Sequence, residues 1–190
     1  MALLASIREG PMPRRMTLLG TFFVCGALVA SSSMEQAADE YHIKAAFLYN
    51  FARFVEWTSA MFRNPQDPFT ICVIGADPFG GTLEETVAGK QVGDRAFRIL
   101  RISEPAQANA CQILFISSSE RKRTAAIIAA LPSAGVLTVG ETDGFAAAGG
   151  VINFTMNEGH VRFQVNRRAA ERADLQISSR LLSLAQIVDR

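Results

Sequence analysis

The sequence has few of the residues that catalytic and metal-binding sites need. It has two histidines, one tryptophan and three cysteines among 190 residues. Neither His42 nor His160 has a Cys, Asp or Glu at metal-ligand spacing, so we expect both to be solvated. The G-x-S-x-G motif of many serine hydrolases is missing. We therefore predict a protein that is not an enzyme, with no catalytic residue, no metal site and no cofactor.

The glycine-containing segment Gly75–Gly81 invites comparison with nucleotide-binding loops. The spacing of Gly75 and Gly80 fits the G-x-x-x-x-G-K-[ST] pattern of a P-loop. Gly81 and Thr82, however, stand where Lys and Ser/Thr are required, so the phosphate cradle would lack its positive charge. The segment also lacks the G-x-G-x-x-G spacing of dinucleotide-binding folds, and we expect no bound nucleotide.

The first 33 residues have the three parts of a secretory signal sequence. The positively charged part contains Arg8, Arg14 and Arg15. Leu18–Val29 is an apolar stretch, and the small residues Ala30–Ser33 follow it. We predict cleavage between Ser31 and Ala38, and Met12 and Met16 are alternative start residues.

Two other fates of this N-terminus are weaker hypotheses. A retained anchor is disfavoured because about a dozen apolar residues are too few to span a bilayer, which takes roughly 20. A lipoprotein signal is disfavoured because Cys25 follows Phe22–Val24, where lipoprotein cleavage requires a small residue. We expect the mature protein to work outside the cytoplasm.

Removal of residues 1–33 changes both the charge and the cysteine count. It takes three arginines and Glu9 from the 19 basic and 18 acidic residues, which leaves 16 and 17. A net charge near zero gives no reason to expect a nucleic acid or an anionic membrane as partner. Cys72 and Cys111 remain, and in an oxidising compartment a disulfide between them is the default. Two separate buried thiols are the alternative.

Hydrophobic periodicity predicts alternating helices and strands after residue 38. Helices are expected over residues 39–57, 82–87, 120–131, 167–173 and 179–188. Strands are expected over residues 69–74, 96–102, 111–116, 136–139, 151–156 and 160–165, and the last two flank the hairpin turn Asn157–Gly159. The sequence therefore predicts one α/β domain over residues 39–190, with a mixed parallel and antiparallel sheet flanked by helices.

Several segments, taken in order, resemble the YfiR family of periplasmic proteins. The opening block Lys44–Trp57 (KAAFLYNFARFVEW) and the cysteine-bearing strands carry the resemblance most specifically. The other matching segments are Cys72–Gly75, Asp77–Gly80, Cys111–Ile116, Leu137–Val139, Gly149–Phe154, Val161–Asn166 and Ile177–Leu182.

The resemblance implies a repressor that acts in the periplasm. Such proteins bind the periplasmic domain of an inner-membrane diguanylate cyclase and hold it inactive, which lowers cyclic di-GMP and biofilm formation. An outer-membrane OmpA-like lipoprotein releases the cyclase by sequestering the repressor. The resemblance also implies a homodimer and a disulfide between Cys72 and Cys111. A second disulfide of some members is missing, because Ala146 and Asn153 stand in that stretch.

A protein without a catalytic site acts through its surface, and apolar residues on half-buried elements are the physical candidates for contact with a partner. The candidate partner-binding residues lie in and after the hairpin: Ile152, Phe154, Phe163, Gln164, Leu175 and Ile177. The alternative is that Phe154 and Phe163 face the core. A periplasmic small-molecule-sensing module is the alternative function.

Overall fold

The computed structural model describes residues 25–57, 61–62, 64, 66–132 and 134–188, and for residues 25–37 the backbone alone. The chain divides into two units, Met1–Glu35 and Gln36–Arg190, and the described strands all belong to the second. The predicted signal sequence lies mostly outside the described residues, so its cleavage stays a prediction. Over the described part of the chain, no helix is both long and apolar enough to cross a membrane.

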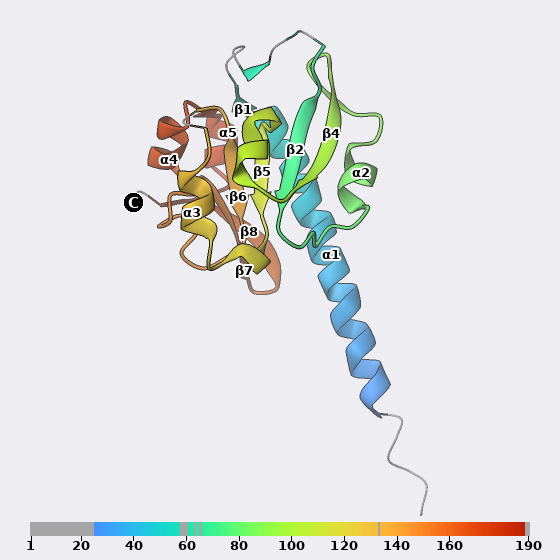
Figure 1. Cartoon of the computed structure of the whole chain (residues 1–190). Coiled ribbons are helices and arrows are strands. Elements are labelled where there is room, and N and C mark those ends of the chain that lie inside the picture. The colour runs from blue at the N-terminus through green and yellow to red at the C-terminus, as the bar shows by residue number, and fades with distance from the viewer. Residues whose placement is uncertain (1–24, 58–60, 63, 65, 133, 189–190) are drawn as a thin grey trace, which may run out of the picture. The chain divides into compact units, whose positions relative to one another are not determined.

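The main sheet is mixed, as the sequence predicts (Figure 1). Its strands are β2 (Phe69–Ile74), β3 (Gln91–Val92), β4 (Arg95–Ile102), β5 (Ile113–Ile116), β6 (Leu137–Gly140), β7 (Ile152–Asn157), β8 (His160–Asn166) and β10 (Gln186–Val188). Their spatial order is β10-β8-β7-β6-β5-β2-β4-β3. Strands β4, β2, β5, β6 and β7 run parallel, whereas β3 and β8 are antiparallel to β4 and β7.

The central strand β2 is buried on both faces, as its continuous apolar run predicts. Alternate side chains point into two separate cores. Phe69 and Val73 enter a first core with helices α1 (Cys25–Phe54) and α2 (Thr82–Val87). Cys72 and Ile74 enter a second core, which η2 (Pro105–Ala110) and α3 (Thr124–Ala129) cover. Helices therefore flank both faces of the sheet.

Helix α1 packs on the sheet through aromatic rings. The rings of Phe47 and Phe51 lie with their centroids 5.3 to 6.0 Å from those of Phe154 and Phe163 in the β7–β8 hairpin. The prediction that this helix begins at Asp39 is wrong, because the helix is already formed at Cys25. The intervening residues contain no proline, so nothing in the sequence stops the helix there.

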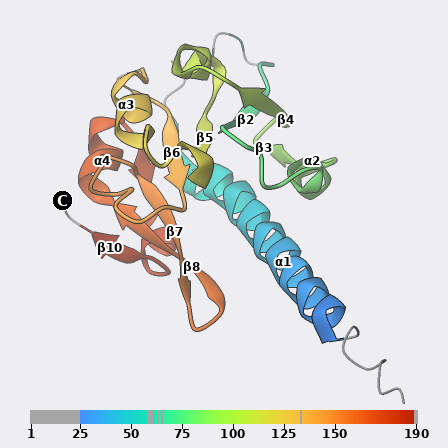
Figure 2. The same cartoon turned by 60° about the horizontal axis from the view of Figure 1, so that its bottom comes forward.

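The β7–β8 hairpin has a tighter turn than predicted (Figure 2). Asn157 and His160 pair across the strands, which leaves the two-residue turn Glu158–Gly159. Both turn residues have positive φ, 50° and 76°, as in the type I′ turns that suit the twist of a hairpin. Gly159 adopts this conformation without a steric penalty.

The C-terminal segment is less helical than predicted. Helix α4 (Arg167–Arg172) forms with Asn166 as its N-cap, whose Oδ1 accepts from the N–H of Ala169 at 3.0 Å. A long helix over residues 179–188 is wrong: α5 (Ser179–Leu182) is one turn, and β10 follows it. The stretch that forms β10 contains Ile187 and Val188, and these β-branched residues add to the open edge of β8.

A disulfide joins Cys72 of β2 to Cys111, just before β5, and the alternative of two separate thiols is wrong. The two Cα atoms lie 5.8 Å apart, and both cysteines are fully buried in the second core. The neighbouring parallel strands β2 and β5 bring the two positions together, as their apolar surroundings in the sequence indicate. The bond ties the η2 crossover to the centre of the sheet.

We expect Cys72→Ser and Cys111→Ser each to lower the free energy of unfolding. The closed loop spans 39 positions, for which loop-closure entropy gives roughly 4 kcal/mol. Chemical denaturation of the oxidised protein and of both variants measures the difference. Addition of reductant should bring the parent protein close to the variants, and equal unfolding curves for all three would contradict the expectation.

Candidate functional site

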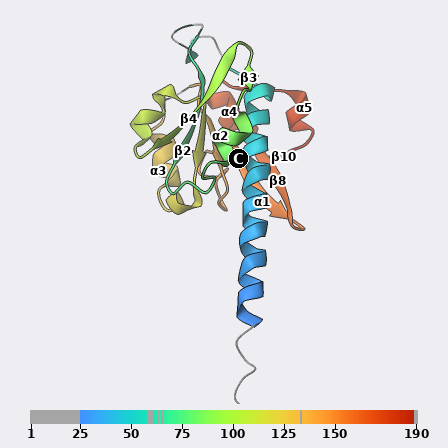
Figure 3. The ribbon, with the colours of Figure 1, turned by 90° about the vertical axis from the view of Figure 1, so that its right-hand side faces the viewer.

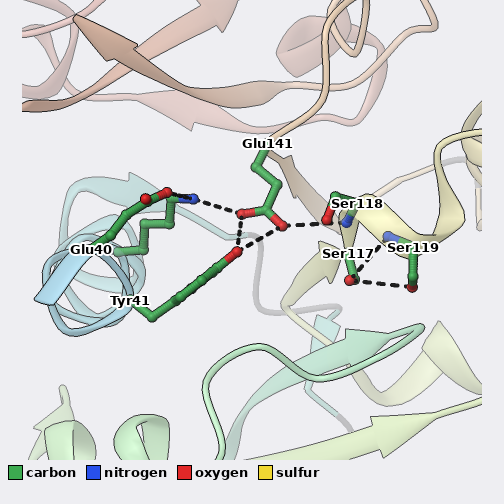
Figure 4. A network of polar contacts seen from close by, with 7 residues as sticks. Glu40, Tyr41, Ser117, Ser118, Ser119 and Glu141 are labelled. Carbon is green, nitrogen blue, oxygen red and sulfur yellow. Dashed lines mark hydrogen bonds and ion pairs between the residues drawn. The ribbon is translucent and has the colours of Figure 1, made fainter. Parts of the chain in front are cut away.

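A partly buried polar network lies where the parallel strands end. Glu141 directly follows β6, and Ser117–Ser119 follow β5, so both lie at the carboxyl edge of the sheet. Tyr41 reaches the same edge from α1 (Figure 4), and Lys44 of the same helix bonds to Glu141 there. In open α/β sheets this edge is where functional groups gather.

The carboxylate of Glu141 is the centre of the network. The Lys44 Nζ lies 2.7 Å from its Oε2 and also pairs with Glu40 at 2.5 Å. The Lys44 and Glu141 side chains are only 5% and 6% exposed. The hydroxyl of Tyr41 donates to Glu141 at 3.2 Å, and the backbone N–H of Ser118 donates at 3.3 Å. These contacts fix α1 to the ends of β5 and β6.

The Tyr41 hydroxyl is hard to ionise in this setting. Burial, followed by the negative charge of Glu141 and the hydrogen bond to it, raises the pKa of Tyr41 far above its ordinary value of 10. The hydroxyl therefore stays protonated and acts as a hydrogen-bond donor, not as a general base. With three donors on Glu141, the network is suited to holding elements together.

Sequence reasoning missed this network, although one signal points to it. Lys44 stands at helical spacing with Leu48, Phe51 and Val55, all of which are buried. A lysine on the buried face of a helix requires a carboxylate partner. The sequence does not identify that partner, because Glu141 lies 97 positions away in a segment that resembles an ordinary turn.

We expect Glu141→Gln to destabilise the protein strongly. Among the described residues, it leaves the buried Lys44 ammonium with Glu40 as its one ion-pair partner, and breaking a buried ion pair costs about 3 kcal/mol or more. Urea unfolding measures the change, with Glu171→Gln on the exposed face of α4 as the matched control. A Glu141→Gln variant as stable as the control would show that the network does not hold α1 on the sheet.

The raised pKa of Tyr41 sets the direction of a pH dependence. The unfolded chain ionises its tyrosines near pH 10, so the contribution of Tyr41 to stability is complete below that pH and is lost as the pH rises above it. Tyr49→Phe leaves Tyr41 as the single tyrosine. In that variant we expect tyrosinate absorbance to rise only together with the loss of circular dichroism. Ionisation near pH 10 in a protein that keeps its native spectrum would contradict this.

Four of the six predicted partner-binding residues lie in the first core. Ile152, Phe154 and Phe163 are buried under α1, and Leu175 is buried beside α4. The alternative interpretation, in which the two phenylalanines face the core, is therefore what the structure shows. The alternation of β7 and β8 places them on the covered face of the sheet. As the chain is folded, these four side chains offer little surface to a partner.

Gln164 and Ile177 are half-buried and border two hollows. Ile177 and Leu175 line a hollow of about 250 Å³ between α4, α5 and β9 (Gln176–Ile177). Gln164 lines another, of about 470 Å³, beside the β7–β8 hairpin, where its Nε2 donates to Oε1 of Gln186 at 3.1 Å. Met156 and Leu184, two exposed large apolar residues, line the second hollow. The structure does not bring Gln164 and Ile177 into one hollow.

The remaining candidates from the sequence have ordinary structural surroundings. His42 and His160 are exposed, and the Nδ1 of each lies within 3.0 Å of the backbone carbonyl oxygen of a residue close in sequence, Ala38 and Glu158. Among the described residues, no three His, Cys, Asp or Glu side chains gather as metal ligands. Gly75 has a φ of +92°, and a Cβ there would lie 2.5 Å from the Oγ of Ser119. Close packing of two loops thus accounts for this glycine.

Ala146 and Asn153 occupy the stretch of the second disulfide that the family resemblance implies. The carbonyl of Ala146 accepts from Nδ2 of Asn166 at 2.9 Å. Asn153 is buried, and within the described part of the chain its Oδ1 has no hydrogen-bond partner. Because Ala146 and Asn153 are not cysteines, this stretch forms no second disulfide. It contains instead a buried hydrogen-bond acceptor without a partner among the described residues.

Comparison with known proteins identifies a family for this chain and partial likenesses to solved structures. The model of a family described as YfiR/HmsC-like matches residues 41–186. No curated protein matches the chain. The structure of an ABC domain in complex with L-Trp from Streptococcus pneumonia is 9% identical, with a TM-score of 0.49, over 63% of this chain and 55% of that chain. A conserved domain protein from Vibrio cholerae is 11% identical, with a TM-score of 0.48, over 63% and 54%.

The chain thus spans about half the length of these two solved structures. Neither likeness bears on function, because both TM-scores lie below 0.5.

Proposed function

Because this chain belongs to the YfiR/HmsC-like family, we propose that it is an exported negative regulator of an inner-membrane diguanylate cyclase. In this proposal it binds the periplasmic domain of the cyclase and holds the enzyme inactive. The match over residues 41–186 carries the proposal, since it runs from α1 to β10 and so includes nearly the whole Gln36–Arg190 unit.

The place of action is part of the proposal. Residues 1–33 act as a signal sequence and are removed, which leaves the α/β domain in the periplasm. The buried Cys72–Cys111 disulfide supports this, because such bonds persist in oxidising compartments and are rare in the cytosol.

Release and assembly complete the proposal. An outer-membrane OmpA-like lipoprotein binds the regulator and frees the cyclase, and the regulator is a homodimer. Protein partners need accessible apolar surface, and Met156, Leu184 and Ile187 supply exposed large apolar side chains near the β7–β8 hairpin and β10. Gln164 and Ile177 remain the candidate contact residues from the sequence.

A small-molecule-sensing module is the second candidate function. The hollow beside the hairpin, at about 470 Å³, is within the size range of ligand sites. A ligand there would alter which partner the protein binds. A rise in the melting temperature of the protein when a periplasmic metabolite is added would favour this function. If the metabolite leaves the binding of the protein to the cyclase unchanged, sensing and repression are separate roles.

Deletion of the gene should raise cellular cyclic di-GMP several-fold and increase biofilm formation. The reason is that the cyclase would be free of its repressor. Mass spectrometry of nucleotide extracts measures the change, and a strain that also lacks the cyclase is the control. Supplying the gene on a plasmid should restore the low level. An unchanged level in the deletion strain would overturn the proposed function.

A further inference from the structure

Two arginines from different elements converge on one phenyl ring at the end of α1. The guanidinium carbon of Arg53 lies 5.8 Å from the ring centroid of Phe54, and that of Arg180 lies 5.6 Å from it. The N–H of Ser178 donates to the carbonyl of Phe54 at 2.9 Å, and β1 (Val55–Glu56) pairs with β9. Backbone contacts thus hold α5 beside the end of α1 (Figure 3), and the two cations are brought together by the fold.

Within the described part of the chain, the arginines at this place form no ion pair. Arg53 and Arg180 are exposed, and neither has an ion pair or a hydrogen bond to a carboxylate there. Arg167 on α4 is likewise exposed and without such a partner. Cation–π contact with Phe54 stabilises the two guanidinium groups but leaves their N–H donors available. These planar groups bind carboxylates through two parallel hydrogen bonds.

A hollow with a mixed apolar and charged lining contains one of these arginines, Arg167. The segment that carries Arg180 also supplies Ile177 and Leu182 to the hollow of about 250 Å³, and Arg167 and Glu171 line it from α4. This volume is below the usual range for a drug-sized ligand, so it suits a single large side chain. Protein-binding surfaces usually have an apolar centre surrounded by a polar rim.

We propose that Arg53, Phe54, Arg167, Ile177 and Arg180 form a surface that binds an acidic segment of a partner protein. The segment places one large apolar side chain in the hollow and its carboxylates on the arginines. The proposed surface rests on the proposed function in one respect: the partner is taken to be a protein of the same regulatory system. Glu171 interrupts the positive charge, so the surface does not fit a bilayer or a nucleic acid.

Labelled synthetic peptides test the proposal in solution. The acidic probe is Asp-Glu-Asp-Phe-Glu-Asp-Glu, the charge control has Lys at each acidic position, and the apolar control has Ala in place of Phe. Fluorescence anisotropy with the oxidised full domain should show binding of the acidic probe, weaker binding of the Ala peptide and none of the Lys peptide. Added salt should weaken the binding.

Variants locate the binding surface. Arg53→Glu/Arg180→Glu should reduce the affinity for the acidic probe at least tenfold, whereas Arg121→Glu/Arg162→Glu, which alters two exposed arginines elsewhere, should leave it unchanged. Circular dichroism confirms that both variants are folded. Equal binding by both variants, no binding by the parent protein, or arginine-dependent binding of phosphatidylglycerol vesicles in place of the peptide would each overturn the proposal.

The two levels of the hypothesis fail separately. If deletion of the gene leaves cyclic di-GMP unchanged while the acidic probe binds through Arg53 and Arg180, the proposed function fails and the surface stands. If deletion raises cyclic di-GMP but the Arg53→Glu/Arg180→Glu variant restores the low level as well as the parent protein does, the function stands and this surface fails.

Discussion

The packing of α1 on the sheet is the interaction on which the rest of this structure depends. Phe47 and Phe51 cover the β7–β8 hairpin in the first core, and Lys44 pairs with Glu141 at the carboxyl edge of the strands. At its other end, Phe54 accepts a hydrogen bond from Ser178. One helix therefore positions the hairpin, the strand ends and the C-terminal segment, and the accessible surface proposed for partners depends on its placement.

Much of the fold follows from the sequence because local signals and burial agree. The continuous apolar run of Phe69–Ile74 gives a central strand, the predicted helix over residues 82–87 is confirmed at both ends, and Asn166 caps α4 as expected. The resemblance to the YfiR family is confirmed by the family match. The errors arise where strand pairing overrides the local hydrophobic pattern. The apolar residues around Gln186–Val188 have helical spacing, but this segment pairs with β8 as a strand.

The site was less predictable, because it depends on contacts between distant segments. Alternation alone does not say which face of a hairpin is covered, so Phe154 and Phe163 were candidates for exposure although α1 covers them. The Cys72–Cys111 bond could be predicted, because the two cysteines outside the predicted signal sequence leave one pairing. The convergence of Arg53 and Arg180 on Phe54 has no sequence signal, because it requires β1 to pair with β9.

The proposed role of this domain is to bind and silence a membrane cyclase. Its most direct test is the rate of cyclic di-GMP synthesis by the purified, detergent-solubilised cyclase at increasing concentrations of the oxidised regulator. We expect a saturable fall of the rate to a low residual value. A rate that stays constant at regulator concentrations far above that of the cyclase would contradict it.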